Sequence, residues 1–511
     1  MAEDLIIGLP FNLDESWMGG AYYLQNVLSA LATLESARQP QIAIITNEGR
    51  SFKFMQESGY PKLVFAHQDH ILRDPRHGGI NMLFAYMLPG MERRTLSWIP
   101  DFQEQHLPYL FTETEIADRM AWHRECLKSA GVLLSSNSAQ RDLTQFYGRA
   151  STPLFVVPFA TFLPPRPPLS DVAPKYGLPK RYFFLPNQFW IHKNHIVVLA
   201  ALRDLAARGV FPRFAFSGKE FDTRASEYGI YLRQLATDWG IIDQIHFLGF
   251  MPRDEQLAVM DGAIAVVQPS RFEGWSTVVE DAKALDQHVI ASNLDVHREQ
   301  MPNGRDFFEP SDHTALTDII ERYWEAPPIR PATDYRIVQR RFGEALLNTF
   351  SALARANPLP ALANADGTAS HTELVPGAHI AFNSRSPAGL DMLGIGWSQA
   401  EETHVWSFGP KAELWLSISD RTSAVRLFLS GNPHVPAGRQ NLSVLVNGQE
   451  QAVGGFEHGS ELTVTLDCTA AAWQRGGMNR VILSPDPIAM PPEDAGDTRI
   501  LGVCIWRLEA A

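Results

Sequence analysis

The first 330 residues repeat one pattern, in which short apolar segments alternate with stretches of helical periodicity. The apolar segments read DLIIGLP, QIAIIT, LSWIP, GVLLSS and LFVVP, then, after a proline-rich stretch, YFFLPN, FAFSG, IHFLGF, AIAVVQPS and HVIAS. Several are apolar almost throughout, as expected of parallel strands that helices cover on both faces. Between them, Leu24, Val27, Leu28 and Leu31 fall on one face of a helix. The pattern predicts two doubly wound α/β domains in tandem, with a hinge-like break near residues 163–179.

Beyond about residue 355 the pattern changes. A stretch rich in Pro, Ala, Gly and Ser is followed by alternating segments such as AELWLSIS, AVRLFLS, LSVLVNGQE and ELTVTLD. The Asn447-Gly448 pair between two such segments predicts a β-hairpin. We therefore predict Rossmann-like domains at 1–168 and 169–356, a linker at 357–373 and an all-β sandwich at 374–511.

Bulk properties exclude several classes of protein. The 511 residues suggest about three domains. A formal net charge of -13 argues against a general nucleic-acid binder. The three cysteines are widely spaced and make neither a disulfide framework nor a metal knuckle. The first residues, MAEDLIIGLPF, are unlike a signal peptide. No apolar run reaches the length of a membrane span. We expect a cytoplasmic protein without a transmembrane segment.

One segment, PSRFEGWSTVVEDAKAL, joins the apolar run AIAVVQ to a helix. Ser276 or Thr277 is placed to cap that helix, and a helix N-terminus favours a phosphate. Glu273 in the turn would reach over the carboxyl end of the sheet, where open α/β sheets bind ligands. The alternative is an ordinary turn whose acidic side chains are solvated.

Together with other segments, this one resembles the retaining GT-B glycosyltransferases of family 4, which carry two glutamates seven residues apart. The other matching segments keep the order of that family over residues 5 to about 300, and they read WMGGAYYLQNVLSAL, SWIPDFQEQHLP, LLSSNSAQRDL and NQFWIHKNHIVVLAAL. The resemblance implies that 1–168 is the acceptor side and that 169–356 binds the nucleotide sugar. The donor would sit between the two domains.

The resemblance assigns donor roles by position. Glu273 would contact the hydroxyls of the sugar, with Gly274 beside it in the turn, and the amides of Trp275, Ser276 and Thr277 would meet the diphosphate. The second glutamate of the family, which holds the ribose, aligns with Asp281 and not with Glu280. One helix step is about 100°, so the two acids cannot both face the ribose; we assign Asp281, and Glu280 would serve if the turn before it is one residue tighter.

The basic pair of the family is incomplete here. Lys193 matches the lysine that neutralises the diphosphate, but Gln188 stands where an arginine is expected. Loss of one cation weakens stabilisation of the leaving group. Lys219 or His192 could compensate, and a solvated loop lysine is the alternative for Lys219.

Candidates on the acceptor side are fewer. Gly19 and Gly20 would let the backbone approach the donor phosphate or the acceptor. Pro100 replaces a histidine of the family, Asp101 could orient an acceptor hydroxyl or merely form a turn, and His106 could act on the acceptor or be structural.

Two further features leave alternatives open. Trp397, Trp406 and Arg499 occupy recurrent positions of the jelly-roll modules that the C-terminal region resembles; the tryptophans could stack on sugars or fill the core. His192 and His195 have the spacing of a metal-ligand pair, but no third ligand is evident, so no metal site is predicted.

The resemblance implies a retaining, metal-independent hexosyltransferase of bacterial surface polysaccharide synthesis. It would need no cofactor beyond a donor, a GDP- or UDP-sugar, and its acceptor would be a glycan or lipid-linked glycan. Peripheral association with the cytoplasmic face of the inner membrane is left open. The alternatives are a GT-B nucleotide-sugar epimerase and a non-catalytic carbohydrate-binding or scaffold protein, which Gln188 and Pro100 would favour.

Overall fold

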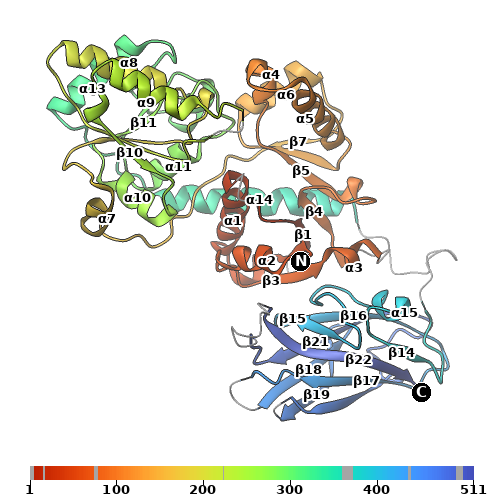
Figure 1. The fold of residues 1–511 in the computed structure, drawn as a ribbon. Coiled ribbons are helices and arrows are strands. Elements are labelled where there is room, and N and C mark those ends of the chain that lie inside the picture. Colours follow the sequence, from red (N-terminus) through yellow and green to blue (C-terminus); the bar gives the residue numbers. More distant parts are fainter. Residues whose placement is uncertain are drawn as a thin grey trace. The chain divides into compact units, whose positions relative to one another are not determined.

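Parallel strands form two of the sheets in this protein and antiparallel strands form two more (Figure 1). The computed structural model describes residues 5–14, 18–73, 79–221, 224–358, 372–435, 439–457, 459–490 and 499–511. The internal contacts divide the chain into two compact units, one of residues 1–97 with 347–511 and one of residues 98–346.

The first parallel sheet has the strand order β3-β2-β1-β4-β5-β6-β7, so the order reverses between β1 and β4. The strands are β1 (Ile6–Pro10), β2 (Gln41–Thr46), β3 (Leu63–His67), β4 (Met82–Ala85), β5 (Thr95–Ile99), β6 (Gly131–Leu134) and β7 (Leu154–Val156). The helices between them are α1 (Met18–Ala32), α2 (Gly49–Gln56), α3 (Gln68–Arg73), α4 (Gln103–His106), α5 (Glu113–Cys126) and α6 (Asn137–Tyr147). Local signals set the helix starts: Thr112 and Glu115 form a capping box before α5, and the Ser136 hydroxyl caps α6.

The second parallel sheet has the order β10-β9-β8-β11-β12-β13, which reverses between β8 and β11. Its strands are β8 (Phe183–Pro186), β9 (Phe214–Ser217), β10 (Ile245–Gly249), β11 (Val266–Gln268), β12 (Val289–Ser292) and β13 (Phe307–Phe308). The helices are α7 (Leu169–Tyr176), α8 (His195–Ala207), α9 (Tyr228–Asp238), α10 (Arg253–Gly262), α11 (Thr277–Ala284), α12 (Asp295–Gln300), α13 (His313–Glu325) and α14 (Tyr335–Ala356).

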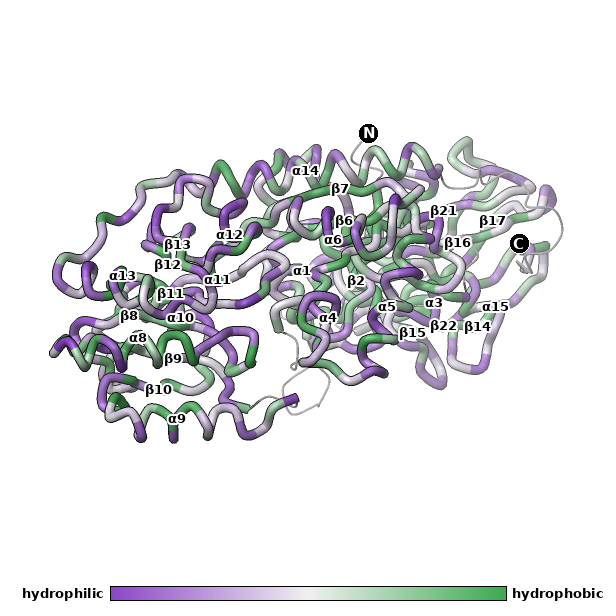
Figure 2. The backbone as a smooth tube through the Cα atoms, turned by 90° about the horizontal axis from the view of Figure 1, so that it is seen from above, coloured by the Kyte–Doolittle hydropathy of each residue, from purple (hydrophilic) through white to green (hydrophobic). Residues whose placement is uncertain are grey.

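Helices cover both faces of this second sheet (Figure 1). One core cluster joins it to α8, α9 and α13, and a separate cluster joins it to α7, α10 and α11. Burial on both faces explains why its strands are apolar almost throughout, whereas α9 alternates between hydrophobic and hydrophilic colours (Figure 2).

The C-terminal region is antiparallel, with one sheet of order β14-β22-β17-β20, on which β15 pairs with β22, and another of order β16-β21-β18-β19. Its elements are β14 (His379–Ala381), α15 (Pro387–Leu390), β15 (Val405–Phe408), β16 (Ala412–Ile418), β17 (Ala424–Gly431), β18 (Arg439–Val446), β19 (Gln449–Glu457), β20 (Glu461–Asp467), β21 (Gly477–Asp486) and β22 (Leu501–Ala510). The predicted all-β module is confirmed. Asn447 and Gly448 join β18 to β19 with φ angles of 49° and 86°, as a tight hairpin turn requires.

Of the two predicted boundary segments, the structure describes the first and only a small part of the second. Within the hinge-like break, residues 169–176 form α7, which ends at Gly177 with a φ of 60°. The predicted linker at 357–373 lies mostly outside the described residues. The three boundaries between the four predicted segments stay predictions. Among the helices that the structure describes, none is long and apolar enough to span a membrane.

The antiparallel module packs on the edge strand β3 within the first unit. The Phe408 ring lies 4.5 Å from that of Phe65 and 5.1 Å from that of Phe52. The Gly396 amide donates to the Phe65 carbonyl at 2.6 Å. Ile395 joins the core cluster that contains residues of β1, β2 and β3. The contact is therefore both apolar and hydrogen-bonded, and it covers part of an edge that would otherwise be open.

Candidate active site

Two loops at the switch point of the second sheet bring Lys193 and Glu273 together. Lys193 ends a short 3-10 turn (Ile191–Lys193) that follows β8, and Glu273 lies in the loop between β11 and α11. The Lys193 Nζ atom is 2.7 Å from the Glu273 Oε1 atom, and the two side chains are only 14% and 10% exposed. Ligands of open α/β sheets bind at this position.

Neutral hydrogen bonds hold the Glu273 carboxylate as well. Its Oε1 atom accepts from Gln268 Nε2 at 2.8 Å and from Ser270 Oγ at 2.6 Å. Asn187 Nδ2 in turn donates to Gln268 Oε1 at 2.9 Å and fixes that amide. Burial alone would raise the pKa of Glu273, but the charge of Lys193 and these bonds outweigh it and lower the pKa to about 2. The group is an ionised acceptor at neutral pH.

Gly274 allows this loop to approach the segment at residues 100–101. A Cβ atom at position 274 would lie 2.2 Å from the Pro100 carbonyl oxygen and 2.8 Å from the Asp101 Cβ atom. The next residue, Trp275, donates from Nε1 to the Phe159 carbonyl at 3.1 Å. The loop is therefore anchored on both sides of Gly274, and only glycine fits there without a shift.

Helix α11 begins directly after this loop. The predicted cap is Ser276: its Oγ atom accepts from the Val279 amide at 3.4 Å, and Thr277 is the first helical residue. The Ser276 amide, one of those that the resemblance assigns to the diphosphate, donates to Gln300 Oε1 at 3.0 Å. The positive end of the helix dipole faces the Glu273 loop.

The adjacent acids Glu280 and Asp281 face different neighbours. Both Asp281 oxygens accept from the Arg253 guanidinium, at 2.7 and 2.9 Å, and the Thr161 hydroxyl donates to the Asp281 Oδ1 atom at 2.7 Å. Glu280 accepts from the Tyr335 hydroxyl at 2.5 Å and from Gln300 Nε2 at 3.0 Å. Each acid is buried, which explains why each has partners.

Gln188, which stands where the family has the arginine of its basic pair, has a structural role. Its Oε1 atom accepts from the Lys219 amide at 2.8 Å and ties the turn after β9 to the loop after β8. The Lys219 Nζ atom lies 5.2 Å from the centre of the Phe250 ring. Gly218 in the same turn has a φ of 134°, and a Cβ there would meet the Asn187 carbonyl at 2.4 Å.

Sequence reasoning missed a cation close to Glu273. Arg271 is exposed, its amide donates to the His192 carbonyl at 2.7 Å, and its Nε atom donates to Asn194 Oδ1 at 3.2 Å. These bonds attach the Glu273 loop to the Lys193 turn. The only signal in the sequence is a basic residue two positions before the glutamate.

His106 and Asp101 have local partners. The His106 Nε2 atom is 2.9 Å from Asp142 Oδ1, which raises the pKa of His106, and its ring centre is 5.0 Å from that of Phe272 beside Glu273. The Asp101 Oδ1 atom accepts from the Gln103 amide at 3.1 Å, as in a turn-forming aspartate.

The remaining candidates lie elsewhere. Burial lowers the pKa of both His192 and His195 to about 3, and the ring of His195 stacks on that of Phe189 at 4.5 Å. Over the part of the chain that the structure describes, no group of three or more His, Cys, Asp and Glu residues is arranged to hold a metal. Gly19 and Gly20 occupy the first turn of α1, in the other compact unit.

Residues 173–339 match the family described as glycosyl transferases group 1. This match covers the whole second parallel sheet and both loops that carry Lys193 and Glu273. With two Rossmann-like parallel sheets and an added antiparallel module, the architecture is GT-B, and the predicted fold class is confirmed.

Individual relatives are distant. The O-antigen chain mannosyltransferase RfbU of Salmonella typhimurium is 28% identical over 102 residues, which are 20% of this chain and 29% of that protein. The chain thus spans less than a third of the curated relative that it matches. Anabaena Alr3699/HepE, solved with UDP and glucose, is 15% identical over 69% of this chain and 98% of its own, with a TM-score of 0.48. WaaG, described as a glycosyltransferase of lipopolysaccharide biosynthesis, is 12% identical over 69% of this chain and all of its own, with a TM-score of 0.44.

Proposed function

We propose that this protein is a retaining glycosyltransferase that moves a hexose from a GDP- or UDP-sugar to a carbohydrate acceptor, without a metal ion. The observation that carries the proposal is the Lys193–Glu273 pair, buried at the switch point of the segment that matches group 1 glycosyltransferases. An ionised carboxylate suits sugar hydroxyls, and an ammonium group beside it suits the diphosphate.

Each site residue has a proposed role. Glu273 accepts hydrogen bonds from the hydroxyls of the donor sugar, while Lys193 and the N-terminal end of α11 stabilise charge on the departing diphosphate. Arg271 is exposed and tied to the Lys193 turn, so it is a candidate for the cation that Gln188 does not supply. Asp281 holds the ribose, either by contacting it directly or by positioning Arg253, with which it is paired.

The reaction exchanges one bond for another on the same face of the sugar. The bond from the anomeric carbon to the diphosphate oxygen breaks, and the acceptor oxygen forms a bond to that carbon. The acceptor proton passes to the leaving phosphate oxygen, so no protein base is required. Pairing of the leaving diphosphate with Lys193 lowers the activation barrier, because negative charge develops on the diphosphate oxygen in the transition state.

A biological context follows from the relative with the matching segment, whose name describes synthesis of O-antigen chains. We infer that the acceptor is a glycan or lipid-linked glycan of a bacterial surface polysaccharide, met at the cytoplasmic face of the inner membrane. His106 and Asp101 are the acceptor-side candidates, because their segment approaches the Glu273 loop at Gly274 and Phe272.

The test is transfer from GDP- and UDP-sugars to oligosaccharide acceptors in the presence of EDTA, with the configuration of the product read by proton NMR. We expect transfer with retention, and a fall in kcat of about 100-fold or more for Glu273→Gln. A matched control is Glu255→Gln, which removes a half-buried carboxylate that also pairs with a lysine, the exposed Lys175, at 2.8 Å. Inversion of configuration, or full activity of Glu273→Gln, would contradict the proposal.

A non-catalytic glycan-binding protein is the second candidate, because Gln188 and Lys219 are engaged in the structural contacts described above. Such a protein would bind glycans but turn over no nucleotide sugar. Isomerisation of the donor without transfer would instead indicate an epimerase.

A further inference from the structure

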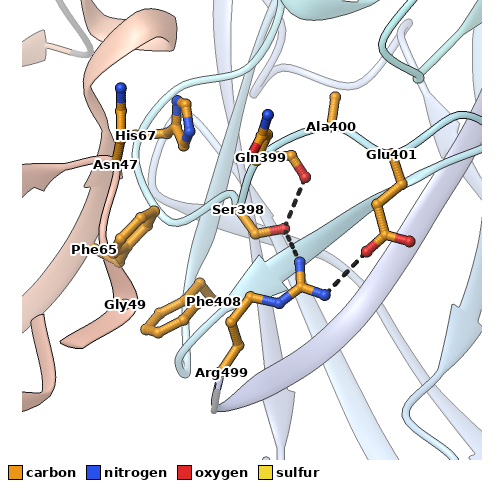
Figure 3. Close-up of a pocket in the computed structure, with 10 residues that line it drawn as sticks. All are labelled: Asn47, Gly49, Phe65, His67, Ser398, Gln399, Ala400, Glu401, Phe408 and Arg499. Atoms are coloured by element: carbon orange, nitrogen blue, oxygen red, sulfur yellow. Dashed lines mark hydrogen bonds and ion pairs between the residues drawn. The ribbon is translucent and has the colours of Figure 1, made fainter. Parts of the chain in front are cut away.

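A pocket of about 330 Å³ lies where the antiparallel module meets the first parallel sheet, inside the first compact unit (Figure 3). Its walls come from both parts. The sheet side contributes the ends of β2 and β3 and the start of α2, and the module contributes the segment before β15, the end of β15 and the residue two positions before β22. The lining residues are Asn47, Gly49, Phe65, His67, Ser398, Gln399, Ala400, Glu401, Phe408 and Arg499.

The sheet places this pocket at a ligand-binding edge. Asn47 directly follows β2, and His67 is the last residue of β3. Both are therefore at the carboxyl ends of parallel strands, the edge at which open α/β sheets bind ligands. The antiparallel module closes the outer side of that edge, so the pocket exists only because the two parts are packed together.

The polar groups of the pocket balance in charge. Arg499 donates from Nη1 to Ser398 Oγ at 3.1 Å and from Nη2 to Glu401 Oε1 at 3.0 Å. Figure 3 shows these three side chains side by side on the module wall. One guanidinium and one carboxylate cancel, so this wall offers donors and acceptors without a net charge. An uncharged polyol fits such a surface, whereas a phosphate would need an excess of positive charge.

Each side of the pocket contributes one aromatic ring, Phe65 from the sheet and Phe408 from the module, and the sheet side also carries an unsatisfied imidazole. The rings of Phe65 and Phe408 lie 4.5 Å apart and are only 4% and 3% exposed, so they pack on each other and form the apolar floor of the pocket. His67 is 4% exposed, and its Nδ1 atom has no hydrogen-bond partner among the residues that the structure describes. Burial lowers the pKa of His67, so the imidazole is neutral and suits hydroxyl groups better than an anion.

We propose that this pocket binds one or two sugar rings of the acceptor glycan, as a second glycan site apart from the site of transfer. The volume lies at the lower end of the roughly 300–1,000 Å³ typical of small-molecule pockets, which suits a short saccharide. The inference rests on the proposed function. A second binding site for the same glycan raises the effective concentration of the acceptor end of that glycan at the site of transfer. It therefore favours repeated transfer to a growing glycan.

The test titrates full-length protein with di- to tetrasaccharides built from mannose, galactose, glucose, rhamnose or N-acetylglucosamine, by calorimetry and saturation-transfer NMR. Gln399 is exposed on the module wall, so Gln399→Trp fills the pocket without disturbing the core. Gln449→Ala is the matched control, because this glutamine is exposed on β19 away from the pocket. We expect at least one saccharide to bind, a loss of affinity of tenfold or more in Gln399→Trp, and wild-type affinity in Gln449→Ala.

Binding that Gln399→Trp leaves unchanged would overturn the pocket assignment, and so would no binding by any saccharide in the panel. The wild-type protein is titrated in parallel with UDP and GDP, which report on the Lys193–Glu273 site alone. Nucleotide binding without saccharide binding in the pocket would reject this inference and leave the proposed transferase standing. Saccharide binding without any nucleotide binding would reject the transferase and favour the glycan-binding protein.

Discussion

At the scale of the residue, Glu273 keeps its charge because Lys193 and two neutral donors, Gln268 and Ser270, surround one carboxylate oxygen. Burial of an unpaired carboxylate would shift its pKa upward. Here the paired ammonium group reverses that shift and holds the pKa at about 2. In the proposed function, this ionised carboxylate exchanges protein donors for the hydroxyls of the donor sugar.

The low pKa of Glu273 predicts a pH dependence of stability. The carboxyl group has a pKa of about 2 when folded and an ordinary value of 4.5, so the unfolded chain binds the proton more readily. The stabilisation is complete above about pH 5 and is lost as the pH falls toward 2. In urea unfolding, the advantage of wild type over Glu273→Gln should therefore shrink between pH 5 and pH 3. An advantage that stays constant over this range would contradict the ion pair.

Arg253 and Asp281 make a second prediction at this scale. Arg253→Met leaves a buried carboxylate with only the Thr161 hydroxyl, so we expect a loss of about 3 kcal/mol in the free energy of unfolding. The exposed pair of Arg203 with Asp204 provides the control, and Arg203→Met should cost less than about 1 kcal/mol. Combining Arg253→Met with Asp281→Asn should restore part of the stability; if it restores none, the two residues are not coupled.

At the scale of the element, the loop between β11 and α11 is shaped by its contacts. Gly274→Ala would press a Cβ atom against the Pro100 carbonyl, 2.2 Å away without a shift. We expect a loss of about 2 kcal/mol of stability, because the crowded backbone must move. Gly455→Ala is the control, since its nearest neighbour would be at 3.4 Å. Urea unfolding followed by tryptophan fluorescence measures both, and equal stabilities would show that the loop yields freely.

Elements differ in how far the sequence predicts them. Long apolar runs such as AIAVVQPS predict β11, and hydroxyl chemistry predicts a cap at Ser276 or Thr277, of which Ser276 is the cap; both signals are local. Strands β3, β4 and β13 were missed, and length does not explain this for β3 and β4, because the predicted strands β1 and β8 have the same lengths of five and four residues. The motif predicts that Lys193 and Glu273 are functional. It could not predict Thr161, which lies 120 residues from its partner Asp281, because only the tertiary fold joins them.

At the scale of the whole molecule, the antiparallel module and the first sheet share a packed surface. Phe408→Ala would leave a void beside Phe52 and Phe65, and we expect a loss of about 3 kcal/mol or more. The control is Phe428→Ala, because Phe428 is half-buried and lies under Arg507 on another strand. Chemical unfolding measures the free energy of unfolding of both variants. If Phe408→Ala costs no more than the control, the shared surface contributes little to stability.

The module also contains residues whose role cannot be predicted from the sequence. Trp397, one of the tryptophans that could have stacked on a sugar, is fully buried and donates from Nε1 to the Glu413 carbonyl at 2.6 Å. Arg499, at another recurrent position, instead lines the pocket. The sequence alone could not separate these outcomes, because the burial of a side chain depends on the strands that pack against it.

The most direct measurement of the central claim is the thermal stability of the full chain against a panel of GDP- and UDP-sugars. A ligand that binds only the folded protein stabilises it by about 2.7 kcal/mol at 100 times its Kd. We expect one donor to raise the Tm of wild type in a saturable way, and expect Lys193→Ala and Glu273→Gln to abolish the shift while Glu255→Gln keeps it. A wild-type protein that responds to no nucleotide sugar, or variants that respond as wild type does, would contradict the assignment of Lys193 and Glu273 to a donor site.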